Sequence, residues 1–251
     1  MTLSKGLKNS IAFLTILPVG MDSDGPTQAA SYMPLFPLIG AALGLVAGIT
    51  VWALEFVLPQ LPSAMIGLGL LLLINGVQRM DGLLDFGDGL MFHGSKSGKL
   101  KVMRDPTTGA GGLVLGLIVL LTTGFSIAAI PSKLIVLTFI GCEACAMFAM
   151  VFATASGKSA HKGMNTVFVE AMHRRPGLRL TASFLIVLAV SFLALRFTGL
   201  IIILGSMITA LGMVEVSNRN FGGLTGDVLG ATSEIARAVS VLLVLVFLKW
   251  A

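Results

Sequence analysis

Residues 111–130 read GGLVLGLIVLLTTGFSIAAI, twenty consecutive residues without a charge. An α-helix needs about 20 apolar residues to cross the hydrocarbon core of a bilayer. The stretch is apolar all round, unlike the one-sided pattern of a helix on the surface of a soluble protein. It therefore predicts a transmembrane helix.

Six other stretches approach the same length and character. Of the 251 residues, 55% are hydrophobic and only 12% are charged, whereas soluble domains average about 25% charged residues. We therefore predict an all-α fold: a polytopic integral membrane helical bundle of about seven transmembrane helices, forming one domain over residues 1–251. Residues 5–18 predict an additional N-terminal interfacial helix. The last three predicted spans are the shortest, so one of them is expected to be tilted or broken. The seven predicted spans are 33–58, 61–79, 111–130, 133–155, 180–197, 199–215 and 235–250.

The lysines and arginines are distributed unevenly. Of the 17, only Lys133, Arg196 and Lys249 fall outside the N-terminal segment and the three long connections with their borders. Short loops rich in lysine and arginine face the cytoplasm. We therefore predict a multi-pass protein of the cell (plasma) membrane with its active site on the cytoplasmic side. The same distribution explains the net charge of +5 without a nucleic-acid partner.

Three aspartates follow the second predicted span, in MDGLLDFGDGL at 80–90. If the chain continues as helix there, Asp81, Asp85 and Asp88 stand at i, i+4 and i+7 and share one face. Carboxylates this close repel each other, and a divalent cation such as Mg²⁺, Mn²⁺ or Ca²⁺ reverses that penalty. Mg²⁺ commonly takes one or two carboxylates together with substrate phosphates. We therefore predict that these three aspartates are catalytic and bind Mg²⁺.

Two aspartates elsewhere are candidates to complete the metal shell. Asp105 precedes a proline in KSGKLKVMRDPTTGAGG, and Asp227 lies in the glycine-rich FGGLTGDVLGATSEIAR that precedes the last span. Each has a plainer interpretation, as a turn residue or as part of an ordinary helix connection. The three aspartates at 80–90 also have one: a solvated acidic helix end neutralised by Arg79 and Lys96.

Basic and polar residues of the long connections are candidates for holding phosphate, because cations, hydroxyls and exposed amides together bind it. The same lysines and arginines also serve the topology. The GKS at 157–159 lacks the spaced glycine and the strand of a nucleotide-binding loop, so we discard that interpretation. The predicted substrate-binding residues are Arg104, Lys158, His161, Lys162, Asn165, Arg175 and Thr225.

One acid lies deep in a predicted span. Glu143 stands within CEAC at 142–145, and a carboxylate at that depth is expected to have a partner. The two flanking cysteines, Cys142 and Cys145, predict packing rather than redox chemistry.

Three motifs, taken in order, carry a resemblance. MDGLLDFGDGL, MRDPTTGAGG and FGGLTGDVLGA are similar to the hallmark segments of the adenosylcobinamide-GDP ribazoletransferases, also called cobalamin-5'-phosphate synthases. FLTILPVG at 13–20 and YMPLFPLIGAALG at 32–44 also resemble the opening of that family. Two positions depart from it: Arg79 replaces a common histidine, and Phe86 replaces a common threonine. A proton-transfer role for that histidine is therefore in doubt here.

The resemblance implies a membrane transferase of cobalamin biosynthesis. Its substrates would be adenosylcobinamide-GDP and α-ribazole or its 5'-phosphate, with release of GMP and Mg²⁺ as cofactor. Membrane lipid is a further expected partner, and assembly as a homo-oligomer is left open. One alternative is a CDP-alcohol phosphotransferase of phospholipid synthesis, although its second aspartate pair and its alanine-arginine element are missing. A divalent-cation transporter is another, but it would place acids at mid-membrane.

Overall fold

The computed structural model describes residues 3–250, apart from the Trp250 side chain. The described chain is helical, as predicted. The helices are α1 (Leu3–Leu14), α2 (Gly25–Ser31), η1 (Met33–Leu35, a 3-10 turn), α3 (Phe36–Leu54), α4 (Gln60–Ile74), α5 (Gln78–Met91), α6 (Lys96–Val102), α7 (Ala110–Ala128), α8 (Ser132–Ser156), α9 (Met164–His173), α10 (Pro176–Leu195), α11 (Phe197–Phe221) and α12 (Gly226–Trp250).

Six segments are long and apolar enough to cross a membrane: η1 with α3, and α7, α8, α10, α11 and α12. The pair α4 and α5 passes the same test together, but the two helices are bent by 91° from each other. The prediction of about seven spans is therefore confirmed. The expectation that one of the last three spans is tilted or broken was wrong about the position of the break. The break lies in the second span, between α4 and α5, whereas α10, α11 and α12 are unbroken helices of 20 to 25 residues.

The break between α4 and α5 lies at residues 75–77. Gly76 and Val77 both have positive φ angles, of 61° and 62°. Glycine adopts this left-handed conformation readily, whereas a β-branched residue rarely does. This turn ends the apolar helix and sends the aspartate-bearing helix in a new direction.

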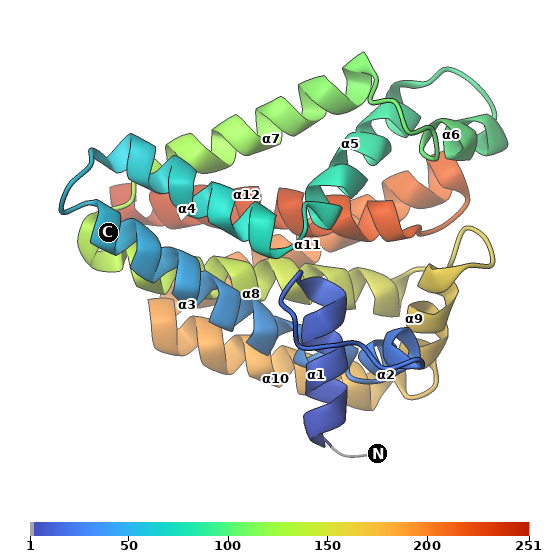
Figure 1. Cartoon of the computed structure of the whole chain (residues 1–251), viewed down its shortest axis with the longest axis horizontal. Helices are drawn as coiled ribbons and strands as arrows, with labels where there is room; N and C mark the ends of the chain where they lie inside the picture. The colour runs from blue at the N-terminus through green and yellow to red at the C-terminus, as the bar shows by residue number, and fades with distance from the viewer. Residues whose placement is uncertain (1–2, 251) are drawn as a thin grey trace.

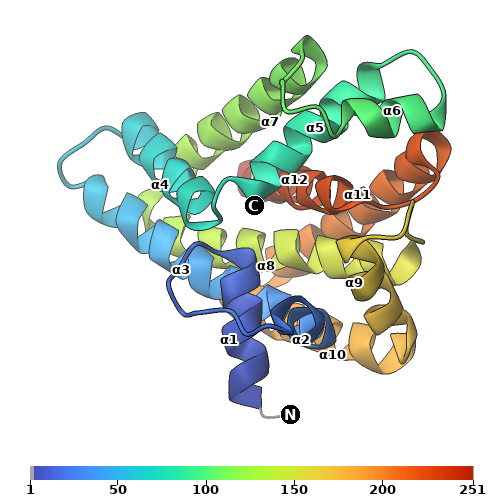
Figure 2. The same ribbon diagram turned by 45° about the vertical axis from the view of Figure 1, so that its right-hand side comes forward.

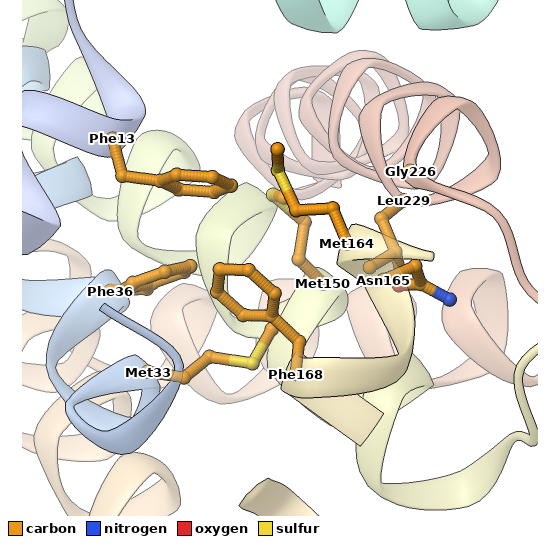
Figure 3. A pocket seen from close by; sticks show the side chains of 9 residues that line it. All are labelled: Phe13, Met33, Phe36, Met150, Met164, Asn165, Phe168, Gly226 and Leu229. Carbon is orange, nitrogen blue, oxygen red and sulfur yellow. The ribbon is translucent and has the colours of Figure 1, made fainter. Parts of the chain in front are cut away.

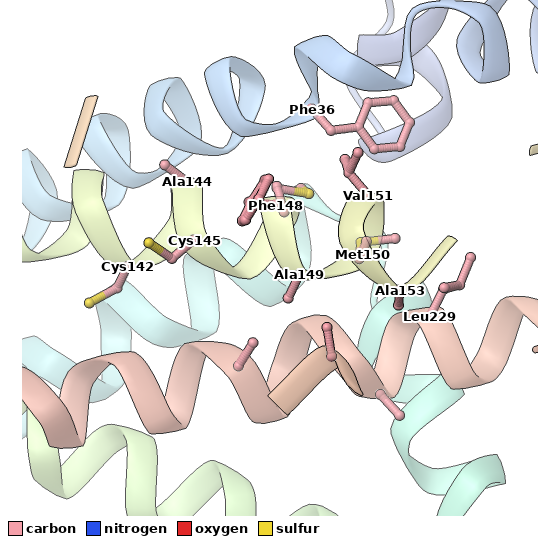
Figure 4. Close-up of a cluster of buried hydrophobic side chains, with 14 of the residues drawn as sticks. Phe36, Cys142, Ala144, Cys145, Phe148, Ala149, Met150, Val151, Ala153 and Leu229 are labelled. Atoms are coloured by element: carbon pink, nitrogen blue, oxygen red, sulfur yellow. The ribbon is translucent and has the colours of Figure 1, made fainter. Parts of the chain in front are cut away.

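Helix α8 runs through the centre of the bundle, with α3, α10, α11 and α12 packed around it. Its buried side chains, including Phe148 and both cysteines, form the core shown in Figure 4. Helix α3 approaches it through Gly40, Gly44 and Gly48, where an added Cβ would lie within 2.8 Å of the α8 backbone. Small residues spaced by four allow this close packing between membrane helices.

The predicted N-terminal helix corresponds to α1, which lies across one side of the bundle beside α2 (Figures 1 and 2). Its buried face is polar. The Asn9 amide donates to Asp22 at 2.9 Å and to Gln28 at 3.0 Å, and Lys8 pairs with Asp22 at 2.8 Å. Polar contacts of this kind hold α1 against the segment that precedes α3.

The long connections gather at one end of the bundle. Residues 92–109, 157–163 and 222–225 lie at the right in Figure 1, where α5 ends and α7 and α12 begin. The opposite end carries only short turns, such as residues 129–131 between α7 and α8. Polar chemistry is therefore concentrated at the first end, which we call the site end.

Candidate active site

Two connections lie side by side at the site end. Leu224 N–H donates to the Lys158 carbonyl at 2.7 Å, and Ala160 N–H donates to the Leu224 carbonyl at 2.9 Å. The same carbonyl accepts from the Asn165 side-chain amide at 2.9 Å. Gly223 permits this approach, because its φ is 158° and a Cβ there would lie 2.6 Å from the Lys158 carbonyl oxygen. The predicted substrate-binding segments 158–165 and 223–225 are thus joined.

Helix α5 packs directly against the start of α12. A Cβ on Gly82 would lie 2.9 Å from the Asp227 backbone, and one on Gly230 would lie 3.1 Å from the Arg79 carbonyl oxygen. This backbone contact brings Asp81 and Asp227 to the wall of one pocket of about 300 Å³. The pocket is lined by Phe13, Leu14, Asn75, Gln78, Arg79, Asp81, Met150, Gly226, Asp227 and Gly230.

The aspartates in and near this pocket repel one another. Asp81, Asp88 and Asp227 all act on Asp85 by charge repulsion. Neither Asp81 nor Asp85 receives a hydrogen bond or ion pair from the rest of the described chain. Among the predicted phosphate ligands, His161 and Arg104 exert a weak electrostatic attraction on the Asp227 carboxylate, opposite to the repulsion from Asp81.

Asp88 has partners of its own. Its two carboxylate oxygens accept the backbone N–H groups of Gly109, at 2.7 Å, and Gly112, at 2.8 Å. These amides belong to the first turn of α7, whose N-cap glycine supplies no side chain. A carboxylate there satisfies unpaired amides and complements the helix dipole. Asp88 thus fastens α5 to α7.

Asp105 lies in an exposed turn. It accepts the backbone N–H of Thr107 at 2.9 Å and the hydroxyl of the same residue. These hydrogen bonds hold the pKa of Asp105 below its usual value. Within residues 3–250, no three His, Cys, Asp or Glu side chains form a group able to hold a metal ion as placed.

The other predicted substrate ligands are placed unequally. Thr225 is buried and caps α12: its hydroxyl accepts Val228 N–H and donates to Asp227, both at 3.2 Å. Lys158 and Lys162 are exposed in the loop beside it. Arg175 is exposed at the start of α10, and within the described residues it has no hydrogen bond or ion pair with the aspartates.

A buried group of four charges lies directly behind the pocket. Arg79 contacts Glu143 at 3.4 Å and Glu234 at 3.7 Å, and Arg237 is hydrogen-bonded to both glutamates. All four side chains are at least 94% buried. We call them the buried quartet. Glu143 therefore has the partner that its depth predicts, and in fact it has two, Arg79 and Arg237.

The buried quartet corrects two sequence-based interpretations. The sequence predicts Arg79 and Arg237 as basic residues at the borders of loops, and its plainer interpretation has Arg79 neutralise the acidic helix end. Instead, both point into the bundle and pair with buried acids from α8 and α12. Alternating acids and cations that neutralise one another make such burial tolerable in a membrane protein.

Some pocket residues were missed by sequence reasoning. Asn75 is buried with neither side-chain polar atom hydrogen-bonded, and it lines the aspartate pocket together with Gln78. The available signal was a polar residue just after LLLLI, where the apolar run stops. Glu234 could have been noted as an acid three residues before Arg237.

The fold and the pocket together define a class: an integral membrane enzyme with an acidic pocket at one end of its helical bundle. The sequence model described as cobalamin-5-phosphate synthase matches residues 6–246, and the chain belongs to that family.

Curated relatives agree with the family match along nearly the whole chain. A Methanocella arvoryzae protein named adenosylcobinamide-GDP ribazoletransferase is 32% identical, covering 94% of this chain and 93% of its own. Proteins of the same name from Methanosarcina mazei and Thermococcus kodakarensis are 32% and 33% identical, covering 96% and 97% of this chain and 92% and 99% of their own. No solved structure matches the chain.

Proposed function

We propose that the chain joins α-ribazole, or its 5'-phosphate, to adenosylcobinamide-GDP and releases GMP. The observation that carries this proposal is the pocket in which Asp81 and Asp227, from the first and third family-like motifs, line the same wall. Motifs separated by about 140 positions meet there, beside loops rich in cations. The names of the relatives supply the substrates, and they favour this reaction over phospholipid synthesis or cation transport.

In the proposed reaction, a ribose hydroxyl attacks the phosphorus that bears the cobinamide. A new O–P bond forms, the P–O bond to GMP breaks, and GMP leaves with its electron pair. The hydroxyl proton passes to a neighbouring carboxylate. Enzymes promote such displacements chiefly by positioning and by neutralising phosphate charge. We assign Arg104 and His161 to the diphosphate, because both exert an electrostatic attraction on Asp227.

We assign the proposed cation to three aspartates, which would have to draw closer around it, because the described residues hold no ready group of three ligands. Asp81, Asp85 and Asp227 present hard oxygen ligands in mutual repulsion, and Mg²⁺ is suited to such ligands together with substrate phosphates. Bound Mg²⁺ would supply charge neutralisation at the phosphates. Asp88 and Asp105 already accept hydrogen bonds from backbone N–H groups. We therefore leave both out of the proposed metal shell: Asp88 positions α5 against α7, and Asp105 stabilises its own turn.

The location of the reaction is part of the proposal. The site end carries most of the lysines and arginines of the exposed loops, and the positive-inside rule assigns such loops to the cytoplasm. We therefore place the reaction on the cytoplasmic side of the cell membrane, with lipid around the apolar surfaces of the helices.

One assay tests the reaction. Purified protein in detergent is incubated with adenosylcobinamide-GDP, α-ribazole and Mg²⁺, and GMP is measured. Release that requires all three additions is expected, and EDTA should stop it. Absence of GMP release, or release that is independent of α-ribazole, would overturn the proposal.

A further inference from the structure

A second, apolar pocket adjoins the aspartate pocket. Both are lined by Phe13, Met150 and Gly226, so they share a wall. The second pocket has a volume of about 100 Å³ and lies between α1, α3, α9 and α12 (Figure 3). Its lining is completed by Met33, Phe36, Met164, Asn165, Phe168 and Leu229.

Aromatic rings and methionines dominate this wall. The ring centroids of Phe13 and Phe168 lie 4.8 Å apart, and those of Phe36 and Phe168 lie 6.3 Å apart. In Figure 3 the three rings stand together opposite Met164 and Leu229. An engineered apolar cavity of about 150 Å³ binds benzene, so a ring system held here must extend across the shared wall into the adjoining pocket of about 300 Å³. Aromatic and methionine side chains favour flat rings through stacking and sulfur contacts.

Two buried amides without full hydrogen bonding line the two pockets. Asn165 is 7% exposed and its Oδ1 has no hydrogen-bond partner, while its nitrogen is held by Leu224. Asn75, 2% exposed, has both amide atoms unpaired. Leaving a buried polar group unsatisfied costs about 1–3 kcal/mol. A ligand with hydroxyl groups would satisfy both amides.

Resting on the proposed function, we propose that the apolar pocket holds the flat, apolar base of the acceptor nucleoside, and that Asn165 and Asn75 bind the hydroxyls of its sugar. The base then lies among Phe13, Phe36 and Phe168. The sugar lies at the shared wall, which directs a hydroxyl toward Asp81 and Asp227.

The amides distinguish this occupant from a lipid chain. An acyl chain would fill the apolar pocket but would leave both Asn165 and Asn75 without partners. A purine base would fit the rings less well, because its additional ring nitrogens are acceptors and the Asn165 nitrogen in the lining is already held by Leu224, so they would be buried without hydrogen bonds. The lining therefore selects a benzimidazole-like base over a purine.

The test measures binding of α-ribazole, alone, to the purified full-length protein by equilibrium dialysis. Leu229→Phe fills the pocket from α12, and Met164→Phe fills it from the exposed side. Leu242→Phe, on the same helix as Leu229 but 39% exposed and away from both pockets, is the matched control. We expect both filling variants to weaken α-ribazole binding at least about tenfold, or ~1.4 kcal/mol. The control variant and the affinity for adenosylcobinamide-GDP should stay unchanged.

A second variant addresses the sugar. Asn75→Leu, which removes an amide without a hydrogen-bond partner in the described chain, should raise the KM for α-ribazole about tenfold, the effect of losing one buried hydrogen bond to the ligand. The KM for adenosylcobinamide-GDP should stay the same. The parent should bind adenosine at least about tenfold more weakly than α-ribazole, because the additional ring nitrogens of adenine would be buried without hydrogen bonds.

The outcomes separate the two proposals. Parental α-ribazole affinity in both filling variants would overturn the pocket assignment even if GMP release is intact. Loss of copurified lipid from those variants, with α-ribazole binding retained, would overturn it in favour of an acyl chain. If the parent binds α-ribazole in a pocket-dependent way but releases no GMP, the proposed reaction fails and the pocket stands.

Discussion

At the scale of single residues, the aspartates fall into two groups: those whose carboxylates accept hydrogen bonds from the described chain and those whose carboxylates do not. Asp81 lines the pocket and Asp85 lies one helical turn further along α5. Neither side chain has a hydrogen bond from the described chain, whereas Asp105 is held by Thr107 in an exposed turn. We expect Asp81→Asn and Asp85→Asn to lower GMP release about a hundredfold or more, since losing a metal ligand exceeds the 10–100-fold effect of an outer-shell change. The assay is initial rate against Mg²⁺ concentration. Asp105→Asn serves as the control and should stay within about twofold. A near-parental rate for Asp85→Asn, or an equal loss for Asp105→Asn, would refute this division.

Phosphate recognition belongs to the same scale. Arg104 acts electrostatically on Asp227, and Lys162 lies exposed next to His161 in the adjoining loop. A charge-assisted contact to phosphate contributes about 1.5–3 kcal/mol, so Arg104→Ala and Lys162→Ala should each reduce kcat/KM roughly ten- to a hundredfold. Lys101→Ala, an exposed residue of α6, is the control. Rates within about twofold of the parent for both test variants would mean that these loops serve orientation alone.

At the scale of helices, the buried quartet connects α5, α8 and α12. Removing one charge leaves an opposite charge buried without compensation, which costs about 3–5 kcal/mol. Glu143→Gln should therefore lower the thermal unfolding temperature in detergent, and activity should fall with it as α5 loses its position on α12. The exposed Glu170→Gln on α9 should leave both unchanged. The double variant Glu143→Gln with Arg237→Gln removes one charge of each sign, so it should be more stable than the single variant. A single variant as stable as the parent would show that the quartet does not brace these helices.

At the scale of the whole molecule, the positions of the connections determine the topology. Single cysteines at Lys99, Lys162 and Thr225 replace residues of three different connections at the site end, in a parent whose Cys142 and Cys145 are both buried. If that end faces the cytoplasm, an impermeant maleimide should label Lys99→Cys and Lys162→Cys only after the membrane is opened. Thr225 is itself buried, so Thr225→Cys should react slowly even then. Labelling of positions 99 and 162 from opposite faces would contradict the bundle.

The helical membrane fold could be predicted from the sequence because it depends on local quantities. A span requires a length of apolar residues, and its orientation follows the charge of short loops. The run at 111–130 and the seven-span count needed nothing more. The three motifs in order were also sufficient to indicate the family, since they are patterns along the chain.

Contacts between distant segments could not be predicted in that way. From the sequence alone, Arg79 and Arg237 are expected in loops, because a charged residue near the end of an apolar run is normally exposed to solvent. Only the tertiary structure pairs them with Glu143 and Glu234. The spacing of Asp81, Asp85 and Asp88 correctly predicts one helix face, yet it cannot show that Asp88 caps α7. The meeting of Asp81 with Asp227, and the apolar pocket beside them, depend on backbone contact at Gly82 and Gly230. The physical reason is that the partner of a side chain depends on how the helices pack in three dimensions. The insertion of a helix into the membrane depends only on the composition of its own segment of the chain.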